Sequence, residues 1–207
     1  MFDEEIVNVL IKYNIDVNIL KKFDEPHRFH HNWNHINYMI KIAKEKDVLT
    51  DELLLLIIFH DIFYDPKSFS NEELSAELLF KYTGNKELKQ AILDTKTHKY
   101  NSIISKILCE LDLNILHDSF NKFAEFDYHI FKEFQFLDYN FYKQKRIDVL
   151  KKYNVNQFYI DYVNNWKPNI ALYAGSFNPF HKGHLNVLHK AEQIFDKVII
   201  ARGINPD

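Results

Sequence analysis

Apolar residues recur every three or four positions through most of the chain, a spacing that predicts amphipathic helices. The first predicted helix lies within 3–15, where acidic residues precede the apolar stripe, as a helix N-terminus favours. A second apolar stripe, also at helical spacing, ends at Ala43. A third helix is predicted over Leu53–Phe63, with Thr50 as its N-cap and Pro66 as its stop. Its apolar run is long enough for a buried helix and far too short to cross a bilayer.

Capping residues and further stripes extend the helical pattern. Ser70, with a glutamate three residues later, has the spacing of a capping box for a helix that Gly84 closes, and Asn85 is expected to cap the next helix. Another helix is predicted over 103–115. Aromatic residues dominate 120–166, and we interpret them as packing or partner contacts. An exposed part of this segment would serve as a homo-oligomer surface.

The last part of the chain changes character. The sequence predicts a short buried strand at 170–174, a loop at 175–184, a helix at 185–195 and a second strand at 198–201. A strand–helix–strand unit is typical of a parallel sheet. Pro168 marks the expected joint between this unit and the preceding helices.

Glycine usage also divides the chain, because only Gly84 of the four glycines precedes residue 170. A helical body avoids glycine, whereas a phosphate-binding loop between a strand and a helix needs it. We therefore predict a mainly α fold in two parts, a helical domain at 1–167 and a short β-α-β segment at 168–207.

Composition narrows the class of protein. Hydrophobic residues make up 46% and charged residues 27%, which indicates a globular chain, and the net charge of -3 gives no footprint for nucleic acid or an anionic membrane. The single cysteine, Cys109, excludes an internal disulfide framework and a cysteine-rich zinc site, and it suits a reducing compartment. No signal peptide is recognised in the acidic N-terminal stretch, so we expect a cytoplasmic protein.

The apolar run that starts at Leu53 ends in an adjacent histidine and aspartate, His60 and Asp61. Burying an unpaired charge costs several kcal/mol, so this pair needs compensation. One explanation is structural: Asp61 caps a backbone end and His60 is a core histidine. The other is a divalent metal ion bound by imidazoles and carboxylates from separate helices, a donor set suited to a hydrolase. Its candidate ligands are His31, His60, Asp61 and Asp112.

These ligands, in the order His31, His60-Asp61 and Asp112, resemble the pattern of the HD superfamily of metal-dependent phosphohydrolases. Longer segments are similar to one subfamily of predicted HD phosphohydrolases and together span roughly 1–167: Arg28–Ile36, Phe59–Pro66, Asn71–Ala76, Thr95–His98 and Asp112–Leu116. The resemblance implies an all-helical HD-domain bundle with those four residues as ligands of a divalent metal, which can be Mn, Fe, Mg, Co, Ni or Zn. Asp112 matches the superfamily better than Glu110.

Further residues are candidates for catalysis or substrate contact in the helical part: Arg28, His35, Asp65, Glu72 and His98. Asp65 lies four residues after Asp61, on the same face if the helix continues, where it can orient a water or take its proton. Glu72 lies at a helix start, which keeps it ionised, and its alternative role is capping. The remaining three are expected to contact substrate phosphate, or else to be structural partners.

The loop of the tail carries His181 and His184 at the expected start of a helix. Its glycines let the backbone approach a phosphate, and the helix N-terminus and two histidines can stabilise a transferring nucleotidyl group. The segment Gly175–Leu185 resembles the HxGH motif of the nucleotidyltransferase superfamily, nearest to pantetheine-phosphate and nicotinate or nicotinamide mononucleotide adenylyltransferases. The resemblance implies the start of a Rossmann-like α/β domain, with Ser176, His181 and His184 at the phosphates of ATP.

The sequence leads to one main hypothesis and two alternatives. The main hypothesis is a metal-dependent phosphohydrolase acting on a nucleotide or related small phosphate ester, joined to an adenylyltransferase-like segment. The first alternative is a bifunctional protein whose main activity is adenylyl transfer to a coenzyme precursor. The second is a helical module that senses a nucleotide without turnover. The preference for nucleotides rests on the association of the two segments.

Overall fold

The structure is a computed structural model that describes residues 3–203. The chain divides into two compact units, Met1–Phe134 and Gln135–Asp207. The division between the units lies before Gln135, whereas the sequence predicted it at Pro168. The two positions differ because residues that follow Phe134 make hydrogen bonds to the β-α-β segment at 168–207. Gln135 Nε2 donates to the carbonyl oxygen of Asp196 at 2.7 Å, for example. The domain boundary at 167/168 stays a prediction from the sequence.

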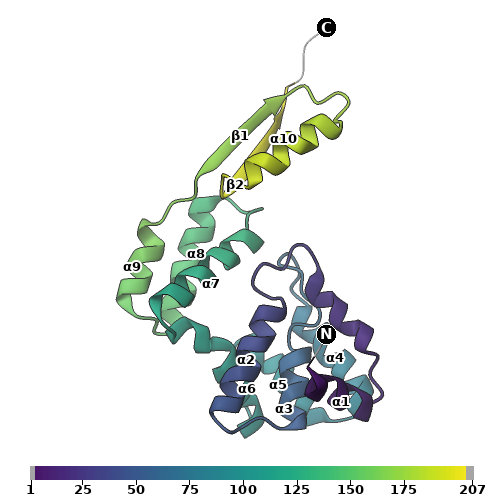
Figure 1. Cartoon of the computed structure of the whole chain (residues 1–207). Coiled ribbons are helices and arrows are strands. Elements are labelled where there is room, and N and C mark those ends of the chain that lie inside the picture. Colours follow the sequence, from purple (N-terminus) through teal and green to yellow (C-terminus); the bar gives the residue numbers. More distant parts are fainter. Residues whose placement is uncertain (1–2, 204–207) are drawn as a thin grey trace. The chain divides into compact units, whose positions relative to one another are not determined.

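Within the described residues the first unit consists of α-helices and two 3₁₀ helices, η1 and η2 (Figure 1). Its elements are α1 (Glu4–Lys12), η1 (Val17–Asp24), α2 (Trp33–Glu45), α3 (Asp51–Phe59), α4 (Asn71–Thr83), α5 (Lys86–Thr95), α6 (Ile103–Asp112), η2 (Leu113–His117) and α7 (Phe120–Glu133). The mainly helical prediction is confirmed, and η1 was not predicted. None of the described helices is long and apolar enough to cross a membrane.

Most of the predicted helix caps are confirmed, because a cap depends on the geometry of residues close together in the chain. The Thr50 side chain accepts from the Leu53 backbone N–H at 3.1 Å, and Asn85 caps α5. Gly84 ends α4 in the left-handed conformation, with φ of 62°. The capping box predicted at Ser70 is wrong: its side chain makes no cap bond to α4.

Replacing Thr50 with alanine is expected to reduce the free energy of unfolding by about 1 kcal/mol, because the first turn of α3 loses a side-chain acceptor. Urea denaturation measures this change. Thr50→Ser retains the hydroxyl and serves as the control, with stability expected close to that of the parent. Equal stability of the alanine and serine variants would contradict the capping role.

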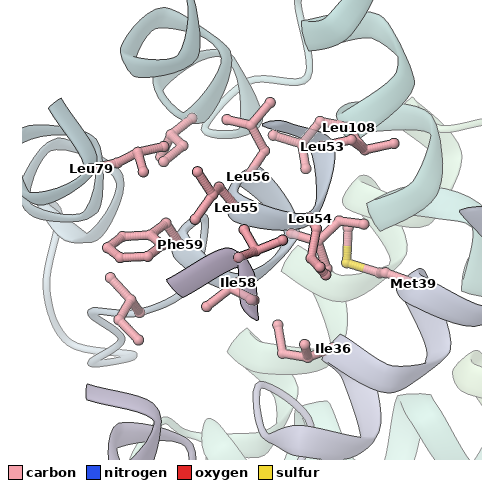
Figure 2. Close-up of a cluster of buried hydrophobic side chains, with 14 of the residues drawn as sticks. Ile36, Met39, Leu53, Leu54, Leu55, Leu56, Ile58, Phe59, Leu79 and Leu108 are labelled. Carbon is pink, nitrogen blue, oxygen red and sulfur yellow. The ribbon is translucent and has the colours of Figure 1, made fainter. Parts of the chain in front are cut away.

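The central helix α3 is buried on all sides, and every residue from Leu53 to Phe59 is at most 1% exposed. It contacts α1, α2, α4, α5 and α6, and Figure 2 shows its leucines and Phe59 packed with Met39, Leu79 and Leu108. This packing fixes the position of the turn that follows α3. The helix ends at Phe59, not at the predicted Phe63, and His60 is its C-cap.

The second unit holds α8 (Tyr139–Lys152), α9 (Gln157–Asn165), β1 (Ile170–Gly175), α10 (Lys182–Glu192) and β2 (Lys197–Arg202). β1 and β2 are parallel, from the pair Ile170 and Lys197 to the pair Gly175 and Arg202, which confirms the strand–helix–strand prediction. β1 was predicted to be buried, but Leu172 is 68% exposed. The reason is that α10 has no buried residues in the structure, so the sheet has little apolar cover.

Candidate functional site

Two histidines and two aspartates converge where α3 ends. His35 of α2 and His60 face each other, with 3.2 Å between their Nε2 atoms. Asp61 Oδ2 lies 2.9 Å from His60 Nε2 and 3.8 Å from His35 Nε2. Asp112, the last residue of α6, places Oδ1 3.2 Å from His35 Nε2 and 3.8 Å from His60 Nε2. We call these four residues the His/Asp cluster.

The electrostatics of the His/Asp cluster fit a divalent cation. His60 Nδ1 lies 2.8 Å from the carbonyl oxygen of Ile57, so Nδ1 carries a proton and directs Nε2 at the cluster. Burial opposes a charge on His60, but the carboxylates of Asp61 and Asp112 and the bond to the Ile57 carbonyl together outweigh burial and raise the pKa of His60 to about 9. The pKa of Asp112 is lowered despite burial, through hydrogen bonds from His35 and His98. Positive charge is therefore stabilised here, and imidazoles with carboxylates suit a divalent metal ion.

His35 was expected to contact substrate phosphate and His31 to bind the metal, but in the structure it is His35 that lies in the His/Asp cluster. The ligand atoms of His35, His60 and Asp61 lie within 4.8 Å of one another, so His35 joins the group that can hold a metal. His31 precedes α2, whose N-cap is Asn32, and its Nδ1 lies 2.6 Å from Glu133 Oε2. The role of His31 as a metal ligand stays a prediction.

Glu133, at the end of α7, anchors this region, and the sequence analysis did not identify it. It is 5% exposed, and its Oε1 accepts from the backbone N–H groups of His30 and His31 at 2.7 and 3.0 Å. The Tyr64 hydroxyl donates to Oε2 at 2.7 Å. Burial opposes ionisation, yet the charge of His31 and these bonds lower the pKa of Glu133 to about 2. Its place in the aromatic segment gave no local signal for this role.

His98 reaches the cluster through Asp112, because its Nε2 lies 2.9 Å from Asp112 Oδ2. The backbone of His98 is left-handed, with φ of 54°, and its N–H donates to the Asp94 carbonyl oxygen at 2.7 Å. The buried Asp94 carboxylate accepts from Ser105 Oγ at 2.5 Å and from the Asn101 side chain at 3.1 Å. Asp94 therefore holds the loop that presents His98.

Arg28 has a structural placement. Its side chain is fully buried, and Nη1 donates to the carbonyl oxygens of His31 and Asp61 at 3.0 and 2.7 Å. Nη2 donates to the Ile62 carbonyl oxygen, and Nε to Glu25. These bonds connect the segment before α2 with the turn after α3. The placement does not support the expected contact between Arg28 and substrate phosphate.

Asp65 and Glu72 lie outside the His/Asp cluster. Because α3 ends at Phe59, Asp65 does not share a helix face with Asp61; it is exposed, and its carboxylate accepts from the Lys67 N–H at 2.9 Å. The Glu72 carboxylate lies 3.6 Å from Lys96 Nζ. Glu110, on the exposed side of α6, lies 3.7 Å from Lys106 Nζ, so Asp112 is the acidic residue of α6 in the cluster.

The tail brings His181 and His184 together at the start of α10, three residues earlier than the predicted helix start. His181 is the N-cap, and its Nδ1 accepts from the Gly183 N–H at 3.1 Å. His184 Nδ1 accepts from the His181 N–H at 3.3 Å, and the two rings stack with centroids 3.7 Å apart. Each Nδ1 is thus an acceptor, so each neutral imidazole carries its proton on Nε2. Ser176 is exposed in the same loop.

Replacing Gly183 with alanine is expected to displace the His181 ring and weaken the cap by about 1 kcal/mol. An added Cβ would lie 3.0 Å from Cε1 and 3.1 Å from Nδ1 of His181, closer than ordinary contact. NMR of the imidazole signals of His181 and His184 measures the displacement. Gly203→Ala, whose Cβ would meet its nearest atom at 4.0 Å, is the matched control. Unchanged imidazole signals in Gly183→Ala would contradict this geometry.

Residues 172–207 match the family model described as Cytidylyltransferase-like. The chain is also similar to phosphopantetheine adenylyltransferases. That of Mycoplasma capricolum is 60% identical over 38 residues, 17% of this chain and 27% of that protein. That of Porphyromonas gingivalis is 59% identical over 39 residues, 19% of this chain and 26% of that protein.

The chain spans about a quarter of the length of the curated relatives it matches. No solved structure matches it. The short parallel sheet and the family match are consistent with a partial nucleotidyltransferase-like domain in the tail.

Proposed function

We propose that the tail binds the phosphates of a nucleotide and takes part in adenylyl transfer to a phosphopantetheine-like acceptor. The observation that supports this proposal is the stacked pair of His181 and His184 at the start of α10, within the stretch that matches the Cytidylyltransferase-like family. The relatives named for phosphopantetheine adenylyl transfer suggest the acceptor.

The geometry suits charge stabilisation. With each Nδ1 accepting a backbone N–H, both Nε2–H groups are available as donors to phosphate oxygens. In the transfer, a phosphate oxygen of the acceptor bonds to the α-phosphorus of ATP, and the bond from that phosphorus to pyrophosphate breaks. His181 and His184 would stabilise the charge that develops on the phosphoryl oxygens, and no covalent bond to the protein is required.

Calorimetry with ATP and a pyrophosphate-release assay with phosphopantetheine test this proposal. We expect ATP binding by the chain and its loss in His184→Ala, with His189→Ala, a histidine near the other end of α10, as the matched control. Pyrophosphate release that depends on both the acceptor and His184 would support transfer. ATP binding that is the same in His184→Ala and the parent would contradict the proposal.

We propose a second function for the helical unit, the metal-dependent hydrolysis of a small phosphate ester. The supporting observation is the convergence of His35, His60 and Asp61, with Asp112 adjoining them. The resemblance to the HD superfamily, carried by His31, His60-Asp61 and Asp112, points to the same chemistry. A bound divalent metal would supply a water of lowered pKa and neutralise charge on the phosphate.

The residues in and around the His/Asp cluster would have distinct roles in this hydrolysis. His35, His60, Asp61 and Asp112 would hold the metal. Glu133 orients the His31 ring, whose pKa is raised because the effect of burial is outweighed by the nearby carboxylate charges together, that of Glu133 foremost. A protonated His31 can donate a proton to the leaving oxygen of the ester. His98 is fixed against Asp112 and would orient that carboxylate.

A phosphate-release screen over nucleotides and coenzyme precursors, with Mn²⁺, Fe²⁺, Mg²⁺, Co²⁺, Ni²⁺ or Zn²⁺ added to chelator-treated protein, tests the second function. We expect release that requires the metal and is lost in His60→Ala. Release without added metal, or release that His60→Ala leaves intact, would contradict it. Metal and nucleotide binding without release would favour a nucleotide-sensing module.

A further inference from the structure

A cavity of about 260 Å³ adjoins the His/Asp cluster. Its walls come from the segment before α2, from α2 itself, from η2 and from α7, all within the first unit. His35 belongs both to the cavity wall and to the cluster, so the cavity and the cluster adjoin at this residue. The wall also includes Phe29, His30, Tyr38, Lys122 and Phe126.

Aromatic rings lead from the cluster into this cavity. The ring centroids of His60 and His35 are 5.3 Å apart, and those of His35 and His30 are 4.5 Å apart. The ring of His30 then meets Phe126 edge to face, with centroids 4.6 Å apart. Phe126 is 8% exposed and is therefore held in place by the core. These rings offer a planar group fixed edges and faces to contact.

Two polar residues of the cavity wall, Tyr38 and Lys122, are already paired, and a third, Glu125, is itself an acidic residue. The Tyr38 hydroxyl donates to Asp118 Oδ2 at 2.8 Å and accepts from Asn114 Nδ2 at 2.6 Å. Lys122 Nζ lies 2.9 Å from the same Asp118 oxygen and 5.6 Å from the centre of the Tyr38 ring. The charge of Lys122 is thus offset, and the Tyr38 ring is fixed. The cavity therefore suits an uncharged group better than a second anion.

We propose that this cavity binds the aromatic group of a phosphate monoester, with the phosphate at the His/Asp cluster. The inference rests on the proposed hydrolase function and adds the specificity of its substrate. Ligand pockets commonly hold about 300–1,000 Å³, so a cavity of about 260 Å³ suits one small planar ring system and not a long or branched group. Phe29, His30, Tyr38 and Phe126 select the ring.

Calorimetry with two non-hydrolysable ligands of equal charge, phenylphosphonate and butylphosphonate, tests the inference. We expect phenylphosphonate to bind at least tenfold more tightly than butylphosphonate in the presence of Mn²⁺, because the two aspartates of the cluster repel a phosphonate when no metal is added. Phe126→Leu keeps an apolar side chain but removes the aromatic ring, and it is expected to reduce the preference for phenylphosphonate over butylphosphonate to about twofold. Because Phe126 is a core residue, Phe29→Leu, at a position 38% exposed, provides a second variant that leaves the core intact. Leu74→Ala, exposed on α4 and outside the cavity, is the control.

Equal affinity for the two phosphonates would overturn the inference, and so would a preference that both Phe126→Leu and Phe29→Leu leave unchanged. Phosphate release from phenyl and butyl phosphate separates this inference from the hydrolase proposal. Tighter binding of phenylphosphonate without metal-dependent release of phosphate would support the proposed role of the cavity and contradict the proposed hydrolase function. Release at equal rates and equal KM from both esters supports the hydrolase and contradicts the cavity.

Discussion

Asp61→Ala is expected to abolish the binding of a divalent metal ion by the helical unit, with a loss of affinity greater than about 100-fold. Asp61 contributes a carboxylate oxygen 2.9 Å from His60 Nε2, and its removal leaves two buried imidazoles facing each other with less negative charge. Calorimetry with Mn²⁺ on chelator-treated protein measures the change. Phosphate release, where the parent shows it, is expected to disappear as well.

Two variants control this experiment. Asp61→Asn keeps the shape of the side chain and removes its charge, so it is expected to lose most of the affinity. Asp65→Ala removes the same chemical group from an exposed turn outside the cluster and is expected to bind metal as the parent does. Retained binding in Asp61→Ala, or an equal loss in Asp65→Ala, would show that the cluster is not the metal site.

Glu133→Ala is expected to reduce the free energy of unfolding by about 3–5 kcal/mol, because it removes one partner of a buried charged pair. Its carboxylate accepts from two backbone N–H groups, from the ring of His31 and from the Tyr64 hydroxyl. All of these donors are left without their acceptor. Urea denaturation measures the loss, and Glu125→Ala, an exposed site on the same helix, is the control, with almost no change expected.

The Glu133 interactions also predict a pH dependence. Since the pKa of Glu133 falls from 4.5 to about 2 on folding, its ionised form stabilises the protein above pH 4.5. That contribution is lost as the pH falls toward 2. Glu133→Gln, which has no charge to titrate, is expected to show less loss of stability over this range. An identical acid-unfolding profile in the parent and in Glu133→Gln would exclude this contribution.

The features that the sequence predicted best are those set by nearby residues. Thr50 and Asn85 cap helices because a side-chain oxygen reaches an N–H two or three residues ahead, and Gly84 adopts a backbone conformation that other residues resist. The parallel pairing of β1 and β2 follows from the helix between them. Ser70 shows the limit of such patterns, because the spacing of a capping box does not ensure that its bonds form.

The sequence by itself therefore determined the helical body, the strand–helix–strand tail, and the residue types that can bind a metal or a phosphate. Only the tertiary structure decided which of them meet. Asn32 caps α2, so His35 lies in the helix and faces His60, whereas His31 precedes the helix and bonds to Glu133, 102 residues away. The end of α3 at Phe59 separates Asp65 from Asp61. Contacts between distant segments depend on how helices pack and where they end, which local spacing does not encode.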